Sequence, residues 1–152
     1  MARGYRLRRA RLADVPRLAA LETQFPTDRL SHANLHHLLT RARADVLVID
    51  AVGLPVADAV VLYRKNSSAA RLYSLVVDPR HRGRGLGKRL LDAAEAAARR
   101  RGRRTMSLEV RPRNRDAHKL YQRCGYARSV TIEDFYEDGT PAWRFVKSLA
   151  RR

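Results

Sequence analysis

The segment with the clearest chemical potential is glycine-rich and basic, Arg82-Gly83-Arg84-Gly85-Leu86-Gly87, and Lys88 follows it. Glycine lets a backbone approach an anion without a Cβ in the way. The first turn of a helix also offers about four unpaired N–H groups and the positive end of the helix dipole. Because an alanine-rich run follows without a break to Arg101, the segment predicts a phosphate-binding loop at the start of a helix.

Two nucleotide-binding folds use similar loops, but their residue requirements are not met here. A dinucleotide-binding fold needs Gly-x-Gly-x-x-Gly after the first strand and an acidic residue that ends the second strand. In this chain the loop follows the fourth expected strand, and an arginine opens it. A nucleoside-triphosphate loop needs Ser or Thr after Gly-Lys, whereas Arg89 follows Lys88. The remaining alternative to a phosphate site is a flexible loop.

The pattern of apolar residues predicts the elements that hold this loop. β-Branched or alternating runs predict strands over Tyr5–Ala10, Asp45–Ile49, Val56–Tyr63, Arg71–Val77, Met106–Val110, Tyr126–Ile132 and Ala142–Val146. Helical spacing and capping residues predict helices over Asp14–Phe25, from Ser31 through Leu39, over Gly85–Arg101 and over Asp116–Cys124. Breaks are expected at Phe25-Pro26-Thr27-Asp28, Gly53-Leu54-Pro55, Asn66-Ser67-Ser68 and Gly102.

The order of these elements indicates the fold class. A β-meander comes first, a strand–helix–strand crossover follows, and a short helix with a closing hairpin comes last. This order predicts a mixed α/β (α+β) fold of three layers around one sheet. The chain has 152 residues with no repeat or low-complexity linker, so we expect one domain over residues 1–152.

Composition narrows the class of protein further. Hydrophobic residues make up 45% of the chain, which excludes a disordered chain, and no apolar run approaches the ~20 residues of a bilayer span. The single cysteine, Cys124, fits a reducing compartment, so a cytoplasmic location without membrane contact is expected. The net charge of +17 attracts polyanions, but the basic residues are scattered and lack interleaved aromatics. Nucleic-acid contact is therefore expected only as a secondary property, and the abundant arginine also matches a GC-rich codon usage.

The segment from Leu72 to Tyr126 resembles the GNAT superfamily of acyl-CoA-dependent N-acyltransferases. The family signature, Arg/Gln-x-x-Gly-x-Gly/Ala, is matched by Arg82 to Gly87, and Val76-Val77-Asp78-Pro79 matches the residues before it. The second half of the signature is matched by Leu108-Glu109-Val110-Arg111, Asn114, Ala117, Leu120-Tyr121 and Cys124-Gly125-Tyr126. Within the superfamily, these residues and Phe135-Tyr136-Glu137-Asp138-Gly139 are most similar to ribosomal-protein-alanine and related protein N-terminal acetyltransferases.

The resemblance implies a fold, a cosubstrate and a reaction. The fold would be a central, mostly antiparallel mixed sheet with splayed central strands, flanked by helices. The cosubstrate would be acetyl-CoA, which an amine attacks directly in a ternary complex. Its pantetheine would bind the backbone of Leu75, Val76 and Val77, and one of these N–H groups could polarise the acetyl carbonyl. Its pyrophosphate would bind Arg82, Gly83, Arg84, Gly85, Leu86, Gly87 and Lys88.

The resemblance also assigns the acid–base residues. Glu109 would be the general base, acting through water, and the alternative is an ion-paired carboxylate on the face it shares with Ser107 and Arg111. Tyr121 would be the general acid for the departing thiolate, and the alternative is a core tyrosine. Asn114 would hold the pantetheine or cap the short helix that follows it.

The acceptor is predicted from the charge of the protein and from the basicity of the amines that it could acetylate. Four of the 15 acidic residues fall within Glu133–Asp138, so an acidic, aromatic loop could attract a cationic acceptor, with Tyr136 and Glu137 binding it. The alternative is a solvated turn. An α-amine with a pKa near ~7.8 is far more often neutral at pH 7 than a lysine near ~10.4, which favours a protein N-terminus. The net charge of +17 would favour approach to the ribosome, so a ribosomal protein is the first candidate.

Other possibilities remain open at this point. A small-molecule amine or a lysine side chain is the alternative acceptor. A non-catalytic acyl-CoA- or RNA-binding module is the alternative class of protein. His32 and His36 have a spacing that could bind a metal ion, but no third ligand is evident, so no metal is expected. Cys124 has no adjacent base and is expected to be a structural thiol.

Overall fold

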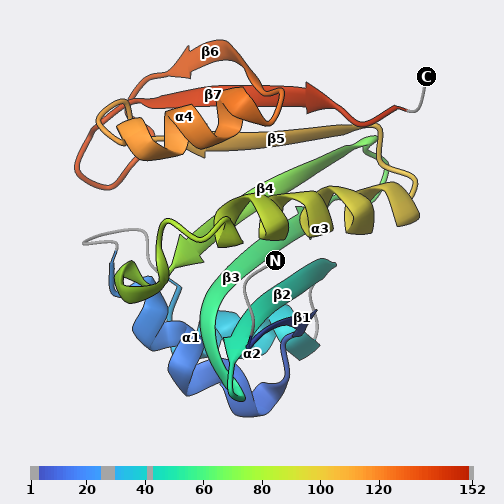
Figure 1. Cartoon of the computed structure of the whole chain (residues 1–152). Helices are drawn as coiled ribbons and strands as arrows, with labels where there is room; N and C mark the ends of the chain where they lie inside the picture. Colours follow the sequence, from blue (N-terminus) through green and yellow to red (C-terminus); the bar gives the residue numbers. More distant parts are fainter. Residues whose placement is uncertain (1–3, 25–29, 41–42, 151–152) are drawn as a thin grey trace.

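The computed structural model of the chain describes residues 4–24, 30–40 and 43–150. Within them one sheet has the strand order β1-β2-β3-β4-β5-β7-β6 (Figure 1). Neighbouring strands are antiparallel except β4 and β5, which are parallel. The strands are β1 (Tyr5–Arg9), β2 (Ala44–Ala51), β3 (Leu54–Tyr63), β4 (Ala69–Val77), β5 (Thr105–Val110), β6 (Ala127–Ile132) and β7 (Ala142–Ser148).

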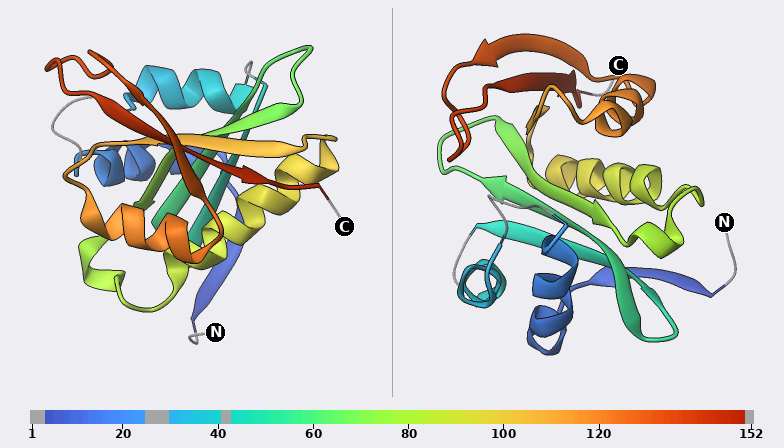
Figure 2. Two further views of the ribbon diagram at one scale, coloured as in Figure 1. Left: turned by 90° about the horizontal axis from the view of Figure 1, so that it is seen from above. Right: turned by 90° about the vertical axis from the view of Figure 1, so that its left-hand side faces the viewer.

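Helices cover both faces of this sheet (Figure 2). They are α1 (Val15–Glu22), α2 (His32–Thr40), α3 (Leu86–Arg100) and α4 (Arg115–Arg123), with short 3-10 turns at Leu12–Asp14 and Pro79–His81. One apolar cluster joins α1 and α2 to the sheet, and the other joins α3 and α4 to its opposite face. The expected mixed α/β, three-layer fold is therefore confirmed. No helix in the described part of the chain combines the length and apolar character needed to cross a bilayer.

Local sequence signals explain where the helices begin and end. The Ser31 Oγ accepts a hydrogen bond from the Asn34 N–H at 3.1 Å, which confirms Ser31 as the cap of α2. Residues Leu12–Asp14 form a 3-10 turn, so the first helix begins at Val15, one residue later than expected, and ends at Glu22. The expected break at Phe25-Pro26-Thr27-Asp28 lies outside the described residues. Gly102 follows α3 with φ +74°, a conformation that suits glycine after a helix.

The two central strands separate after a short paired segment. The β4–β5 register pairs Ala69–Arg71 with Thr105–Ser107 and ends there, although β4 continues to Val77 and β5 to Val110. Figure 1 shows the two strands diverging, with α3 lying across the sheet below them. The expected splay is therefore confirmed. It places the end of β4 and the end of β5 on opposite sides of one opening.

Candidate active site

Two adjoining pockets occupy this opening. The first is lined by the end of β4, the glycine-rich loop and α4. The second is lined by the middle of β4, the end of β5, α1 and Tyr136. Both are lined by Leu75, Asn114, Ala117 and Tyr121. A molecule in one pocket would therefore meet a molecule in the other beside Tyr121, which is the geometry that a transfer between two substrates requires.

The glycine-rich loop has the backbone that its sequence predicts. Gly83 and Gly85 both have φ +76°, in the left-handed region that favours glycine. A Cβ at either would meet nothing within 4 Å, so backbone conformation and not space requires glycine there. At Gly87 a Cβ would lie 3.3 Å from Leu120 Cδ2, so α3 and α4 approach closely at this point. The loop leads directly into α3, whose first N–H groups have no partner within the helix.

Some of the predicted phosphate-binding side chains line the first pocket and others do not. Arg82, Gly83, Gly85, Leu86 and Gly87 line it, together with Leu75, Val76 and Val77 of β4. Arg84 and Lys88 do not. The Arg84 guanidinium donates to the Tyr5 hydroxyl at 2.8 Å, and the Lys88 ammonium donates to Asp92 at 2.8 Å. The side chains of these two residues are thus engaged by Tyr5 and Asp92.

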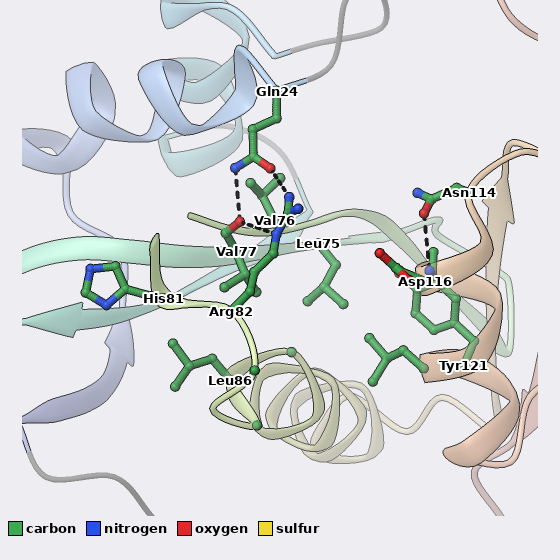
Figure 3. Close-up of a pocket in the computed structure, with 15 residues that line it drawn as sticks. Gln24, Leu75, Val76, Val77, His81, Arg82, Leu86, Asn114, Asp116 and Tyr121 are labelled. Atoms are coloured by element: carbon green, nitrogen blue, oxygen red, sulfur yellow. Dashed lines mark hydrogen bonds between the residues drawn. The ribbon is translucent and has the colours of Figure 1, made fainter. Parts of the chain in front are cut away.

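A residue not identified from the sequence fixes Arg82. Gln24 donates from Nε2 to the Val77 carbonyl at 3.0 Å, and its Oε1 accepts from the Arg82 guanidinium. The Arg82 Nε also donates to the Val77 carbonyl, at 3.4 Å. Figure 3 shows Gln24 above the pocket, with its amide between Val77 and Arg82. These hydrogen bonds hold the guanidinium at the pocket.

Gly85→Ala is expected to weaken binding of the phosphate-bearing ligand several-fold and to lower the free energy of unfolding by roughly 1–2 kcal/mol, because a Cβ disfavours positive φ. Calorimetric titration with coenzyme A and urea unfolding measure the two effects. Gly53→Ala is the matched control, because Gly53 has φ +82° in the β2–β3 turn, away from the pocket. Equal losses of affinity in both variants would contradict the assignment of the loop.

The second pocket contains Glu109 in an ion-paired setting. Its side chain is 4% exposed, Oε1 accepts from Arg71 Nε at 2.7 Å, and Oε2 accepts from Arg144 Nε at 2.9 Å. Arg144 lies directly opposite Glu109 in the β5–β7 register. The ion-paired alternative is therefore present, and Glu109 nevertheless lines the pocket. Its carboxylate therefore lies at the pocket and shares its charge with two cations.

Tyr121 lies where the two pockets meet. Its side chain comes from α4, is 7% exposed, and packs edge-on to Tyr126 with ring centroids 5.8 Å apart. Burial raises the pKa of Tyr121 above its ordinary value. The phenol therefore remains protonated throughout the neutral range, as a proton or hydrogen-bond donor must.

Asn114 and the acidic loop complete the site. The Asn114 Oδ1 accepts from the Ala117 N–H at 3.2 Å and so caps α4, while the residue also lines both pockets. Tyr136 lines the second pocket, and the Arg111 guanidinium lies 3.9 Å from its ring centre. Glu137 lines neither of the two pockets. Across the described residues, no group of three or more His, Cys, Asp or Glu could hold a metal ion.

The pocket also contains Glu22, which was not identified as functional from the sequence. Glu22 ends α1, is 1% exposed and lines the second pocket. The signal available in the sequence was a carboxylate at helical spacing from Val15 and Leu18, on the face expected to be apolar. A second set of missed residues, Arg71 and Arg144, comes from strands that are distant from Glu109 in the sequence.

Curated relatives are N-acetyltransferases by name. The putative ribosomal protein bS18-alanine N-acetyltransferase of Bacillus subtilis is 26% identical over 133 residues, 87% of each chain. The enzyme named ribosomal protein bS18-alanine N-acetyltransferase in Escherichia coli K12 is 34% identical over 67 residues, 44% of this chain and 45% of that one. An uncharacterized N-acetyltransferase of Methanocaldococcus jannaschii is 36% identical over 64 residues, and the match covers 42% of this chain and only 28% of that protein.

Solved structures share the fold, and a family model matches most of the chain. Ard1 from Thermoplasma volcanium has a TM-score of 0.86 at 22% identity, over 97% of this chain and 99% of that one. The ribosomal-protein-S18-alanine N-acetyltransferase of Escherichia coli has a TM-score of 0.83 at 22% identity, over 97% and 96%. The model of the acetyltransferase (GNAT) family matches residues 15–126. The chain therefore belongs to the acetyltransferase (GNAT) family and is an acyltransferase, as the resemblance of its sequence implies.

Proposed function

We propose that this acetyltransferase moves the acetyl group of acetyl-CoA to the α-amine of a protein N-terminus, by direct attack in a ternary complex. The observation that carries the proposal is the meeting of two pockets beside Tyr121. The first pocket takes acetyl-CoA, with its pyrophosphate on the glycine-rich loop and its pantetheine along Leu75, Val76 and Val77. Support comes from a structural neighbour from Salmonella typhimurium, described with its cofactor acetyl-CoA, with a TM-score of 0.80.

The second pocket takes the acceptor. Its walls contain Arg111 and the carboxylates Glu22 and Glu109. Because Arg71 and Arg144 pair with Glu109, Glu22 is the carboxylate that suits a cationic group. Two observations support a protein N-terminus as the acceptor. Curated relatives are named as N-acetyltransferases of the alanine of ribosomal protein bS18, and a solved structure with a similar fold is the NatC complex bound to a Gag peptide and CoA. We infer a ribosomal protein as the first acceptor to test. The single cysteine, Cys124, fits a cytoplasmic site of action.

Two residues carry the proton transfers in this proposal. Glu109 accepts a proton from the nitrogen through water, and Arg71 and Arg144 hold its carboxylate in place. Tyr121 donates to the sulfur as the thiolate departs. Asn114 fixes the start of α4 and thereby the position of Tyr121. We further propose that residues 1–152 form one N-acetyltransferase domain.

Labelled acetyl-CoA tests the proposal directly. A cell extract is incubated with the protein and the labelled cosubstrate, and peptides are analysed by mass spectrometry. The proposal is supported if the label appears on N-terminal α-amines and if the protein also acetylates a synthetic peptide that carries the same N-terminal sequence. Label confined to lysine side chains or small amines assigns the other acceptor class. If the protein acetylates none of these acceptors, a non-catalytic acyl-CoA- or RNA-binding module is favoured.

Tyr136→Ala is expected to raise the acceptor KM about tenfold without changing that of acetyl-CoA, because Tyr136 lines only the second pocket. Glu137→Lys is expected to raise it less, because Glu137 acts from outside the pocket through its charge. Steady-state kinetics at two salt concentrations separate the contact made by Tyr136 from the charge effect of Glu137, because salt screens only the charge effect. Glu133→Lys is the control for charge alone. If neither Tyr136 nor Glu137 moves the acceptor KM, the loop does not border the acceptor.

A further inference from the structure

The buried carboxyl groups of this chain fall into two classes. Most are neutralised by a basic side chain: Asp14 and Asp50 by Arg8, Asp45 by Arg9 and Arg101, and Glu95 by Lys147. Glu22 and Asp58 are also buried, and within the described residues neither has a basic partner. In a chain with a net charge of +17 the missing partner is notable, because basic side chains are abundant. Burial without a counter-charge is costly, so these two carboxyls call for an explanation.

Glu22 is held by neutral donors and faces the acceptor pocket. The Ser74 hydroxyl of β4 donates to its Oε1 at 2.7 Å, and the Leu30 N–H lies 3.5 Å from its Oε2. Burial raises the pKa of Glu22, and these two donors only partly oppose it. Its carboxylate is therefore more basic than an ordinary glutamate.

Asp58, on β3, is close enough to Glu22 for their charges to interact. It is 1% exposed, and within the described residues neither of its carboxyl oxygens has a hydrogen-bond partner. Burial and the neighbouring charge of Glu22 raise the pKa of Asp58 well above its ordinary value. Asp58 therefore favours its neutral form more strongly than an ordinary aspartate does, which limits the negative charge beside Glu22.

We propose that Glu22 removes the first proton from the acceptor's ammonium group, and so is a second catalytic carboxylate beside Glu109. The proposal rests on the proposed transfer of acetyl to an amine. An ammonium must lose two protons to become an amide nitrogen. Glu22 takes the first, which frees the nitrogen lone pair to form the C–N bond with the thioester carbonyl carbon. The second leaves the tetrahedral adduct for Glu109, the C–S bond breaks, and Tyr121 protonates the thiolate.

The proton balance closes over one turnover. The proton on Glu109 restores Tyr121, and the proton on Glu22 is released to solvent. The net reaction is ammonium plus acetyl-CoA giving the N-acetyl product, free coenzyme A and one proton. Glu22 suits the first step because, among the described residues, its carboxylate is bound by the neutral donors Ser74 and the Leu30 N–H, whereas the Glu109 carboxylate is engaged by Arg71 and Arg144.

The groups that face Glu22 come from every element around it. They are Asp58 on β3, Ser74 on β4, the N–H of Leu30 before α2, and, across the pocket, Glu109 with Arg71 and Arg144, Arg111, Tyr121 and Tyr136. Of the acidic groups, Asp58 has a pKa raised well above its ordinary value, and Glu109 is ion-paired with Arg71 and Arg144. We therefore expect the ionisation of Glu22 to determine how kcat/KM for an ammonium acceptor depends on pH.

The pH dependence of kcat/KM for a peptide acceptor, in wild type and Glu22→Gln, tests the proposal. The variant can use only acceptor that is already neutral, which is about 5% of an α-amine at pH 6.5 and over about 90% at pH 9. The wild type should therefore exceed the variant by about tenfold or more at pH 6.5 and by less than about twofold at pH 9. A loss by the same factor at every pH would show a structural role and overturn the proposal.

Two further measurements test whether the ionisation of Glu22 causes the pH dependence. Ser74→Ala removes a donor to the carboxylate, so the acidic limb of the kcat/KM profile should move to higher pH. A ¹³C NMR titration of the wild type, with the Glu22 signal assigned by its absence in Glu22→Gln, should give a midpoint above the ordinary ~4.3. A midpoint at or below that value, or an unmoved limb in Ser74→Ala, would overturn the proposal. Wild-type turnover with parallel pH profiles contradicts the role of Glu22 alone, whereas no wild-type turnover with any amine contradicts acetyl transfer itself.

Discussion

Tyr121→Phe is expected to lower kcat by about 10²- to 10⁴-fold, the usual contribution of a positioned general acid. The phenylalanine ring fills the same buried space beside Tyr126, so the two pockets keep their shape. Only the hydroxyl is lost, and with it the donor that we propose for the departing sulfur. Because burial raises the pKa of Tyr121, a hydrogen bond that strengthens as the thiolate forms suits the site better than early transfer of the proton. The measurement is single-turnover release of coenzyme A.

The control for this prediction is a neighbouring tyrosine. Tyr126→Phe removes a buried hydroxyl that donates to Glu95 at 2.9 Å and lines neither pocket, so its kcat should remain close to that of the wild type. Glu109→Gln is expected to reduce kcat by a similar factor to Tyr121→Phe, and the affinity for acetyl-CoA should change by less than about twofold in either variant. Full activity in both variants would remove the acid–base assignment, and a matching loss of cosubstrate affinity would indicate a damaged pocket.

Asp58→Val is expected to stabilise the protein by about 1–3 kcal/mol at pH 7, which is the usual cost of a buried polar group without a partner. Asp58 lies between Val48 and Val76 in the strand register, so an apolar β-branched residue suits its surroundings. Urea unfolding of the two proteins gives the difference in free energy. The opposite change, a loss of stability, would mean that Asp58 has a partner in solution.

The sign of the pH dependence distinguishes Asp58 from the paired carboxyls. Folding raises the pKa of Asp58, so the part of its cost that comes from ionisation is absent below the unfolded pKa of about 3.9 and grows as the pH rises through that value. The advantage of Asp58→Val should therefore shrink as the pH falls toward 4. Asp45 provides the contrast, because burial alone would raise its pKa, but the hydrogen bonds from Arg9, Tyr63 and Arg101 outweigh burial and lower it. Asp45→Asn should destabilise the protein at neutral pH, and that loss should diminish as the pH falls through the lowered pKa.

Local signals predicted most of the fold. The left-handed glycines Gly83 and Gly85, the Ser31 cap and the amphipathic α3 each depend on residues within a few positions, so the sequence contains the whole of their cause. The glycine-rich loop that lines the first pocket could therefore be predicted from its own residues.

Long-range neighbours limit what could be predicted of the site. Glu109 was predicted as the general base or an ion-paired carboxylate, but its partners Arg71 and Arg144 reach it only because β4 and β7 flank β5. Arg84 and Lys88 belong to the loop by sequence, yet Tyr5 and Asp92 turn their side chains elsewhere. Gln24 and Glu22 enter the site from the end of α1, whose position over β4 no local pattern specifies.

The short pairing of β4 with β5 gives this sheet an edge in its interior. Beyond Arg71 the side of β4 that faces β5 resembles the margin of a sheet, where backbone groups are open to pairing with another chain. Margins of that kind promote aggregation when they are exposed. Here α3, α4 and the glycine-rich loop surround the open stretch, so a second sheet cannot reach it (Figure 2). A slender, extended molecule with amide groups of its own can enter, and its binding would slow hydrogen exchange at the amides of Leu75, Val76 and Val77.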